Sequence, residues 1–253
     1  MQDFKALEAE WELRVPNDQY VVLRLDGRSF HRYTRGLERP YDLQFMSDMD
    51  ATAVALCREI AGARCAYVQS DEISLLITAF TDGATNAMID ESCDLMFGGR
   101  VQKLVSISAA IASATFNARR SHLTDTFGLF DSRVLTLETV DDVHAYFEHR
   151  QFDCQKNAVT MSASTVATHH ELIGVRTVDR AQMIPGGRDA IPGAFLYGRL
   201  VERVSSPDTA TFKHGRTGQM QTVSFDRNEW RAAPASVFGV GAHLRDLIPT
   251  VER

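Results

Sequence analysis

Hydrophobic positions follow two different periods along the first half of the chain. Four short runs are rich in β-branched and other apolar residues, which is typical of strands. They cover residues 20–25, 65–69, 73–78 and 133–137. Between and after these runs, apolar residues recur at three- and four-residue steps, which predicts helices. The predicted helices cover residues 43–60, 100–117 and 141–151.

The first six elements are in the order β-α-β-β-α-β, which is typical of a ferredoxin-like α+β fold. Only Ser70, Asp71 and Glu72 separate the second and third strands, so we predict a hairpin with Asp71 at its tip. Asp26 directly follows the first strand. Because the first and third strands are central neighbours in this topology, Asp26 and Asp71 should meet at one edge of the sheet.

The pattern changes after the third predicted helix. We predict a further helix over 157–173 and two strands over 196–204 and 217–225. The chain is therefore divided into a catalytic domain, residues 1–150, and a smaller appended α+β part, residues 151–253. We expect the two parts to form one compact unit.

Charge is divided unevenly between these parts. The net charge of −6 argues by itself against a nucleic-acid partner. However, residues 1–149 contain 14 Lys+Arg and 23 Asp+Glu, a balance of −9, whereas residues 150–253 contain 13 and 10, a balance of +3. The basic part either binds phosphates through its arginines or presents a solvated arginine surface, and charge alone leaves both open.

The remaining composition indicates a cytoplasmic protein without a membrane partner. No apolar run reaches the roughly 20 residues of a membrane helix, and residues 1–17 lack the apolar core of a signal peptide. Cys57 and Cys65 could share a zinc ion, but the four cysteines include no Cys-x-x-Cys pair. Reduced core cysteines are the simpler interpretation.

Two carboxylates that converge at a sheet edge repel each other unless one is protonated or a cation lies between them. Mg²⁺ prefers oxygen ligands and leaves room for substrate phosphates. A pair of such ions about 4 Å apart supports in-line phosphoryl displacement. Gly27 lets the backbone approach a metal or a phosphate, and the turn from Gly27 to His31 offers successive amides. The alternative is an ordinary turn and an ordinary hairpin tip without a metal.

In the order of several motifs, the chain resembles the tRNA-His guanylyltransferase superfamily, including its Thg1-like branch. Members of this superfamily add nucleotides in the 3′-to-5′ direction. The two most specific motifs are Arg24-Leu-Asp-Gly-Arg-Ser-Phe-His-Arg32 and Ala66-Tyr-Val-Gln-Ser-Asp-Glu72. Further matches are Arg39-Pro-Tyr-Asp42, the helix headed by Lys103, Phe130-Asp-Ser-Arg133 and Arg150-Gln-Phe-Asp153. The resemblance spans most of the chain.

The resemblance implies a polymerase-type palm in which Asp26 and Asp71 are catalytic and, with the backbone of Gly27, hold two Mg²⁺ ions. ATP and GTP or other nucleoside triphosphates are the implied substrates. The residues implied to bind the nucleotide are Asp26, Gly27, Arg28, Ser29, Phe30, His31, Ser70, Asp71, Glu72 and Lys103. Those implied to contact tRNA are Arg39, Lys156, Asn157 and Arg180.

The basic C-terminal part then has a role in binding tRNA phosphates. Besides Lys156 and Arg180, the candidates as a group are Arg176, Arg199, Arg203, Lys213 and Arg216. The resemblance further implies a homo-oligomer, either a tetramer or a dimer.

One departure from the family pattern bears on the substrate. Residues 155–158 read Gln-Lys-Asn-Ala where eukaryotic guanylyltransferases carry His-Ile-Asn-Asn, so only Asn157 is kept. This form is similar to the Thg1-like branch and implies template-dependent repair of tRNA 5′ ends. The alternative is addition of the −1 guanylate to tRNA-His.

Two hypotheses come from other classes. A nucleotidyl cyclase also uses a ferredoxin-like palm, but its hairpin carries Gly-Gly-Asp-Glu-Phe in place of the Gln-Ser-Asp-Glu found here. A non-catalytic RNA-binding protein with a relic site is disfavoured because both aspartates are intact.

Overall fold

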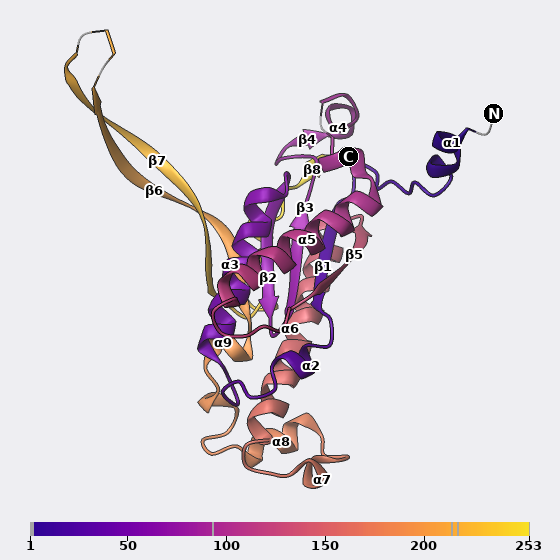
Figure 1. Cartoon of the computed structure of the whole chain (residues 1–253), viewed down its shortest axis with the longest axis vertical. Coiled ribbons are helices and arrows are strands. Elements are labelled where there is room, and N and C mark those ends of the chain that lie inside the picture. Colours follow the sequence, from indigo (N-terminus) through magenta and orange to yellow (C-terminus); the bar gives the residue numbers. More distant parts are fainter. Residues whose placement is uncertain (1–2, 93, 214, 217, 253) are drawn as a thin grey trace.

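The computed structural model describes residues 3–92, 94–213, 215–216 and 218–252. Its centre is a six-stranded sheet with the strand order β5-β1-β3-β2-β6-β7 (Figure 1). The strands are β1 Tyr20–Gly27, β2 Ala63–Gln69, β3 Glu72–Ile77, β5 Phe130–Leu137, β6 Arg199–Lys213 and β7 Met220–Pro234.

The first four strands of this sheet confirm the predicted ferredoxin-like topology. The order β5-β1-β3-β2 puts the first and third strands of the βαββαβ unit at its centre, and all pairs in it are antiparallel. Strand β1 is buried on both faces, which explains why it reads as a continuous apolar run rather than as an alternating one.

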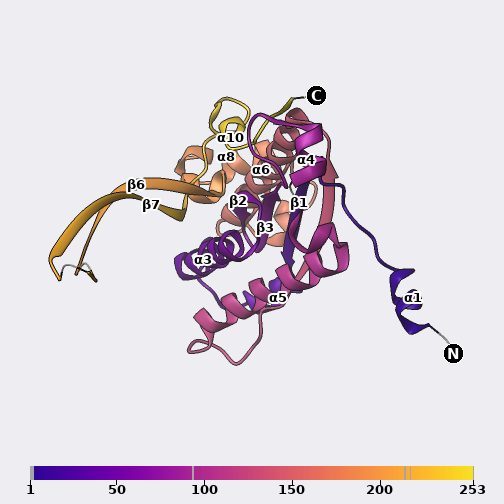
Figure 2. The same ribbon diagram turned by 90° about the horizontal axis from the view of Figure 1, so that it is seen from above.

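Helices cover both faces of the sheet (Figure 2). Helices α3 (Leu43–Glu59) and α5 (Val101–Arg120) lie on one face, where Leu23 and Leu25 of β1 contribute to the core. Helix α6 (Val140–Ala163) lies on the other face, where Val22 joins a second core with Phe147 and Cys154. The alternation of strand side chains therefore serves two cores at once.

Helix α6 differs from its prediction. The two helices expected over 141–151 and 157–173 are one continuous helix up to Ala163, followed after a break by α7 (His169–Leu172). Thr139 begins α6 with a capping box to Asp142. Buried positions continue without a gap through Gln151, Cys154 and Ala158, and no Gly or Pro interrupts them, so nothing ends the helix at 151.

The C-terminal strands extend the central sheet. Strand β6 pairs with β2, and the β6–β7 hairpin continues beyond the sheet as a long arm (Figure 1). Both strands reach well past the predicted ranges, which end at 204 and 225. The proposed division at residue 150 falls inside α6, and a separate role for residues 151–253 stays a prediction.

Shorter elements connect these layers. They are α1 Phe4–Ala9, α2 Phe30–Tyr33, β4 Ala84–Thr85, α4 Asn86–Ser92, the 3₁₀ helix Met96–Gly99, α8 Thr177–Met183, the 3₁₀ helix Arg188–Ala190, α9 Gly193–Leu196, α10 His243–Asp246 and β8 Val251–Glu252. Helix α1 stands away from the rest of the chain (Figures 1 and 2). Among the described residues, no helix is both long and apolar enough to cross a membrane.

The zinc alternative finds no support in the described part of the chain. Cys57, Cys65 and Cys154 are buried free thiols, and Cys93 lies outside the described residues. Within those residues, no group of three or more His, Cys, Asp or Glu side chains is arranged to hold a metal ion. Burial strongly raises the pKa of the Cys57 thiol, which disfavours the thiolate that zinc binds.

Candidate active site

The end of β1 and the β2–β3 turn lie side by side at one edge of the sheet. Asp26 is opposite Glu72 in the β1–β3 register. The Gly27 N–H donates a 3.1 Å hydrogen bond to the carbonyl oxygen of Asp71. Ser70 adopts a left-handed φ of 46°, which reverses the chain between the two strands. The predicted meeting of Asp26 and Asp71 at one edge is confirmed.

This edge concentrates negative charge. Burial is the main cause that raises the pKa of Asp26, and the carboxylates of Glu72 and Asp131 raise it further. Burial also raises the pKa of Asp71 more than hydrogen bonds from Ser70 and from the turn backbone lower it, and Asp26 adds to the rise. Both carboxylates therefore favour a proton or a cation as a partner.

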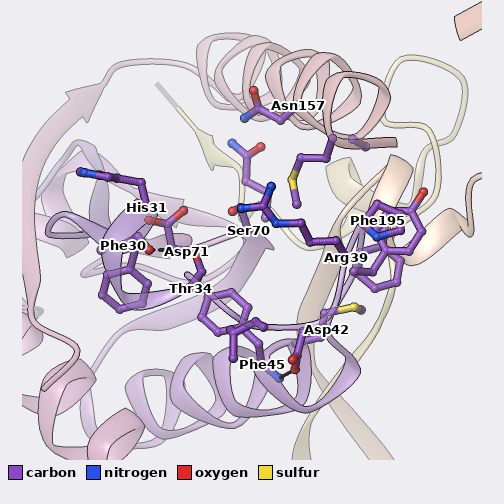
Figure 3. A pocket seen from close by; sticks show the side chains of 18 of the residues that line it. Phe30, His31, Thr34, Arg39, Asp42, Phe45, Ser70, Asp71, Asn157 and Phe195 are labelled. Atoms are coloured by element: carbon purple, nitrogen blue, oxygen red, sulfur yellow. Dashed lines mark hydrogen bonds between the residues drawn. The ribbon is translucent and has the colours of Figure 1, made fainter. Parts of the chain in front are cut away.

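A cavity of about 550 Å³ opens beside the two aspartates (Figure 3). This size is within the range of small-molecule sites. The cavity is lined by the segment between β1 and α3, by the β2–β3 turn, and by α6 together with Phe195 and Arg199. It therefore joins the carboxylate edge to the basic C-terminal part of the chain.

Two of the four residues expected to contact RNA line this cavity. Arg39 extends its guanidinium group toward Ser70, and Asn157 projects from α6 on the opposite side (Figure 3). The other two lie outside the cavity lining. Lys156 forms a 2.9 Å ion pair with Asp153, and Arg180 donates hydrogen bonds to Thr160 and to the Leu172 carbonyl oxygen. Lys156 and Arg180 therefore already have partners in the fold.

The predicted nucleotide loop, residues 27–31 at the end of β1, is packed tightly. A Cβ atom on Gly27 would lie 2.4 Å from the ring of Phe30, so only glycine fits at this position. Phe30 is buried against Phe45, Phe116 and Phe130. This packing fixes the backbone that Gly27 presents to the cavity.

The predicted nucleotide contacts divide into two groups. Those that line the cavity are Asp26, Gly27, Ser29, Phe30, His31, Ser70 and Asp71. Arg28 is exposed outside the lining, and its N–H donates a 2.7 Å hydrogen bond to the Leu129 carbonyl oxygen. Lys103 lies on α5 with its Nζ 5.8 Å from the centre of the Phe97 ring. Contact of Arg28 and Lys103 with a nucleotide stays a prediction.

Glu72 faces α6 instead of the cavity. Arg150 donates two hydrogen bonds to its carboxylate, at 2.8 and 2.6 Å, and Gln69 donates a third at 3.1 Å. Arg150 also binds Asp153, which places it at the centre of a network that links the hairpin turn to α6. Glu72 therefore has a supporting position beneath Asp71, and its contact with a nucleotide stays a prediction.

Several cavity residues had no sequence signal as site residues. Tyr41 and Phe195 stack with ring centres 3.8 Å apart, and the Tyr41 hydroxyl lies 2.6 Å from the Ser162 Oγ. Arg199 is one basic residue among several in the sequence, whereas in the structure it is buried and donates a 2.7 Å hydrogen bond to Asp50. Tyr41 lies in the segment before α3, Phe195 in α9 and Arg199 at the start of β6, so neither periodicity nor spacing could group them.

The oxygen-rich edge fits a hard divalent cation. Asp26 and Asp71 supply carboxylates, and Gly27 leaves its backbone accessible at the same edge. In the described residues no third carboxylate, His or Cys completes a metal cluster, so phosphate oxygens and water would complete the coordination. Mg²⁺ is usually bound in this way, by one or two carboxylates and the phosphates of its substrate.

A ferredoxin-like sheet with paired aspartates beside a cavity of this size is the arrangement expected of enzymes that act on nucleoside triphosphates with Mg²⁺. The tRNAHis guanylyltransferase family profile matches residues 1–138, and the chain belongs to this family. The family expected from the motifs is thereby confirmed.

Solved structures agree with this assignment. The chain is 31% identical to a bacterial tRNA(His) guanylyltransferase-like protein in complex with ATP, with a TM-score of 0.72 over 79% of this chain and 86% of that chain. A bacterial tRNA(His) guanylyltransferase-like protein in complex with GTP is 25% identical, with a TM-score of 0.69 over 93% and 91%. The α+β palm fold is therefore confirmed.

The curated relatives are longer than this chain. An uncharacterized protein of Acanthamoeba polyphaga mimivirus is 29% identical over 203 residues, which are 71% of this chain and 66% of that protein. The tRNA(His) guanylyltransferase of Debaryomyces hansenii is 29% identical over 150 residues, which are 55% of this chain and 51% of that protein. The chain thus spans about half to two thirds of the length of these relatives.

Proposed function

We propose that this protein adds nucleotides in the 3′-to-5′ direction to the 5′ end of tRNA, guided by a template, and so repairs truncated 5′ ends. The observation that carries the proposal is the convergence of Asp26 and Asp71 beside a cavity that also contains Arg39 and Asn157. The nucleotide complexes of the bacterial family members support nucleoside triphosphates as substrates.

Each part of the cavity has a role in this reaction. The amides of Ser29, Phe30 and His31 bind the triphosphate, because the N–H groups of Gly27 and Arg28 already donate to the Asp71 and Leu129 carbonyl oxygens. We extend the role of Arg39, which the resemblance assigned to RNA, to the triphosphate as well, because a guanidinium suits phosphate oxygens. Asp26, Asp71 and the Gly27 carbonyl would hold two Mg²⁺ ions. When bound, these ions would lower the pKa of the attacking hydroxyl and stabilise the leaving group.

The chemistry needs two displacements at phosphorus. The 5′ monophosphate of the RNA first attacks the α-phosphate of ATP or GTP and releases pyrophosphate. The 3′ hydroxyl of the incoming nucleotide then attacks the activated 5′ phosphate, and the nucleoside monophosphate leaves. The protein contributes by aligning these groups and by excluding water, which together account for a large share of such catalysis.

RNA would approach along α6 and the C-terminal part. Asn157 faces the cavity from α6, and the exposed Arg176 and Arg203 belong to the basic part. Binding through phosphates should weaken steeply with salt. The cytoplasm is the compartment that such a substrate implies.

A homo-oligomer is the second part of the proposal. Phe212 and Phe225 are exposed on the β6–β7 arm, beyond the residues of β6 that pair with β2. A two-stranded ribbon is marginally stable alone, and its apolar side chains would be covered by a second copy of this chain. Analytical ultracentrifugation tests this directly, and a monomer at micromolar concentration would refute it.

The Gln-Lys-Asn-Ala sequence at 155–158 favours repair over guanylate addition. In the structure, Asn157 and Ala158 line the cavity, so the changed motif lies where the RNA end would enter. Addition of the −1 guanylate to tRNA-His is the second candidate, and the names of the curated relatives favour it.

The test uses 5′-monophosphorylated tRNA that lacks its first nucleotide, together with ATP, Mg²⁺ and labelled nucleotides. We expect extension that matches the opposite strand. Full-length tRNA-His in parallel tests guanylate addition. Cyclic or dinucleotide products from free triphosphates would instead indicate a cyclase, and RNA binding without any product would indicate a relic site.

A further inference from the structure

The nucleotide loop rests on a buried charged network that lies outside the cavity lining. Asp48 of α3 is fully buried and accepts hydrogen bonds from Gln44, Arg119 and Arg120 at 3.0, 2.8 and 2.9 Å. Arg120, at the end of α5, is 3% exposed. Its Nε donates a 3.0 Å hydrogen bond to the hydroxyl of Tyr33.

Arg120 is also enclosed by aromatic rings. Its guanidinium carbon lies 5.6 Å from the ring centre of Tyr33, 5.8 Å from that of Phe45 and 5.6 Å from that of Phe116. Cations over aromatic faces are attracted by the ring quadrupole, more so when they are desolvated. Arg120 is thus held by one carboxylate, one hydroxyl and three rings.

Tyr33 connects this network to the nucleotide loop. Tyr33 ends the single-turn helix α2 and stacks on Phe30, with ring centres 5.1 Å apart and an interplanar angle of 24°. Phe30 in turn lies against the Cα position of Gly27. The path from Asp48 through Arg120, Tyr33 and Phe30 therefore ends at the backbone that faces the cavity.

Helix α2 has little local support of its own. It is four residues long, and Ser29 at its N-cap makes no capping hydrogen bond and has a left-handed φ of 57°. One helical turn without a cap is unstable in isolation, so tertiary contacts must hold it. The aromatic stack and the hydroxyl bond from Arg120 supply those contacts.

Stability alone does not account for this arrangement. A buried ion pair often adds no more stability than apolar side chains of similar volume would, whereas it demands one particular geometry. We propose that Arg120, oriented by Asp48, is a positioning residue that fixes Tyr33 and thereby the triphosphate-binding loop from Gly27 to His31. This proposal rests on the proposed function, because it assigns the same loop to the nucleotide.

The decisive variant is Tyr33→Phe, which removes the hydroxyl and keeps the stacked ring. Loss of one hydrogen bond that orders the loop should raise the dissociation constant for Mg²⁺·ATP and the KM for the incoming nucleotide by about three- to tenfold. The kcat at saturating nucleotide should change less than twofold, and the melting temperature should fall only slightly.

Arg119→Gln is the matched control. Arg119 also bonds to Asp48, but its side chain is 40% exposed and no contact to Tyr33 is observed. We expect Arg119→Gln to lower the melting temperature with an unchanged nucleotide dissociation constant. Arg120→Lys keeps the charge, but a lysine lacks the forked guanidinium that bonds to Asp48 and Tyr33 at the same time. This variant should therefore weaken nucleotide binding more than Tyr33→Phe does.

Equal effects of Tyr33→Phe and Arg119→Gln on the dissociation constant would overturn the proposal, as would a constant unchanged in Tyr33→Phe. Direct binding separates this proposal from the proposed function. If the wild type binds Mg²⁺·ATP but extends no RNA, repair is refuted while the binding comparison still tests the positioning role.

Discussion

The backbone N–H of Gly27 donates a 3.1 Å hydrogen bond to the carbonyl oxygen of Asp71. This bond joins the end of β1 to the turn between β2 and β3, outside the regular ladder of the sheet. The bond keeps Asp26, the neighbour of Gly27, close to Asp71, although 44 residues separate the two aspartates in the sequence.

Replacement of either aspartate by asparagine should raise the thermal stability of the protein and lower its activity. Asp71→Asn removes a desolvated charge without changing the shape, so we expect the melting temperature without metal to rise by about 1–3 °C. RNA extension should fall about a thousandfold or more, because a carboxylate that would hold Mg²⁺ is lost. Differential scanning fluorimetry and the extension assay measure the two effects. A variant that keeps its activity would refute the catalytic role.

The raised pKa values of Asp26 and Asp71 predict a pH-dependent response to Mg²⁺. Without a cation, the folded state keeps protons that the unfolded state releases above about pH 4, so stability should fall as the pH rises through the raised pKa values. Mg²⁺ binds the ionised pair, and its stabilising effect should therefore increase over the same pH range and level off above it.

This pH response is measured as the Mg²⁺-induced shift of the melting temperature at several pH values between 4 and 8. The double variant Asp26→Asn with Asp71→Asn is the control, and its shift should be small at every pH. A wild-type shift that stays constant across this range would contradict the prediction.

Gly27→Ala should disturb both the fold and nucleotide binding. The added Cβ would lie 2.4 Å from the Phe30 ring, and Phe30 is buried among aromatic neighbours that cannot yield. Overpacking of this kind costs about 1–3 kcal/mol of unfolding free energy. Gly193→Ala is the matched control, because its Cβ would meet nothing closer than 4.0 Å. Urea denaturation of the two variants would show equal losses if the packing argument is wrong.

Arg39→Ala should weaken nucleotide binding in particular. Hydrogen bonds from a guanidinium to phosphate contribute about 1.5–3 kcal/mol, so we expect the KM for the nucleotide to rise about ten- to hundredfold. Arg39→Lys should recover only part of this loss. Arg35→Ala, an exposed position of the same segment outside the cavity lining, controls for a general loss of positive charge. Similar KM values for Arg35→Ala and Arg39→Ala would count against a direct contact.

The sequence by itself determined the topology and the two acidic residues at one end of its central strands. Strand and helix periods are local properties, and the βαββαβ order leaves few ways to arrange four strands. The sequence alone therefore predicts that Asp26 and Asp71 lie together. The ends of the later elements are harder to predict from the sequence, because the lengths of α6 and of the β6–β7 arm depend on contacts with residues distant in the sequence.

Only the tertiary structure decided which residues surround the aspartates. Glu72 and Asp71 are neighbours in one turn, yet they face different partners, because Arg150 of α6 holds the Glu72 carboxylate. Likewise, Arg39 and Asn157 line one cavity, whereas Lys156 and Arg180 have partners elsewhere. Spacing records the order of residues along the chain, but the direction of a side chain depends on contacts between elements, and those contacts form only when the chain folds.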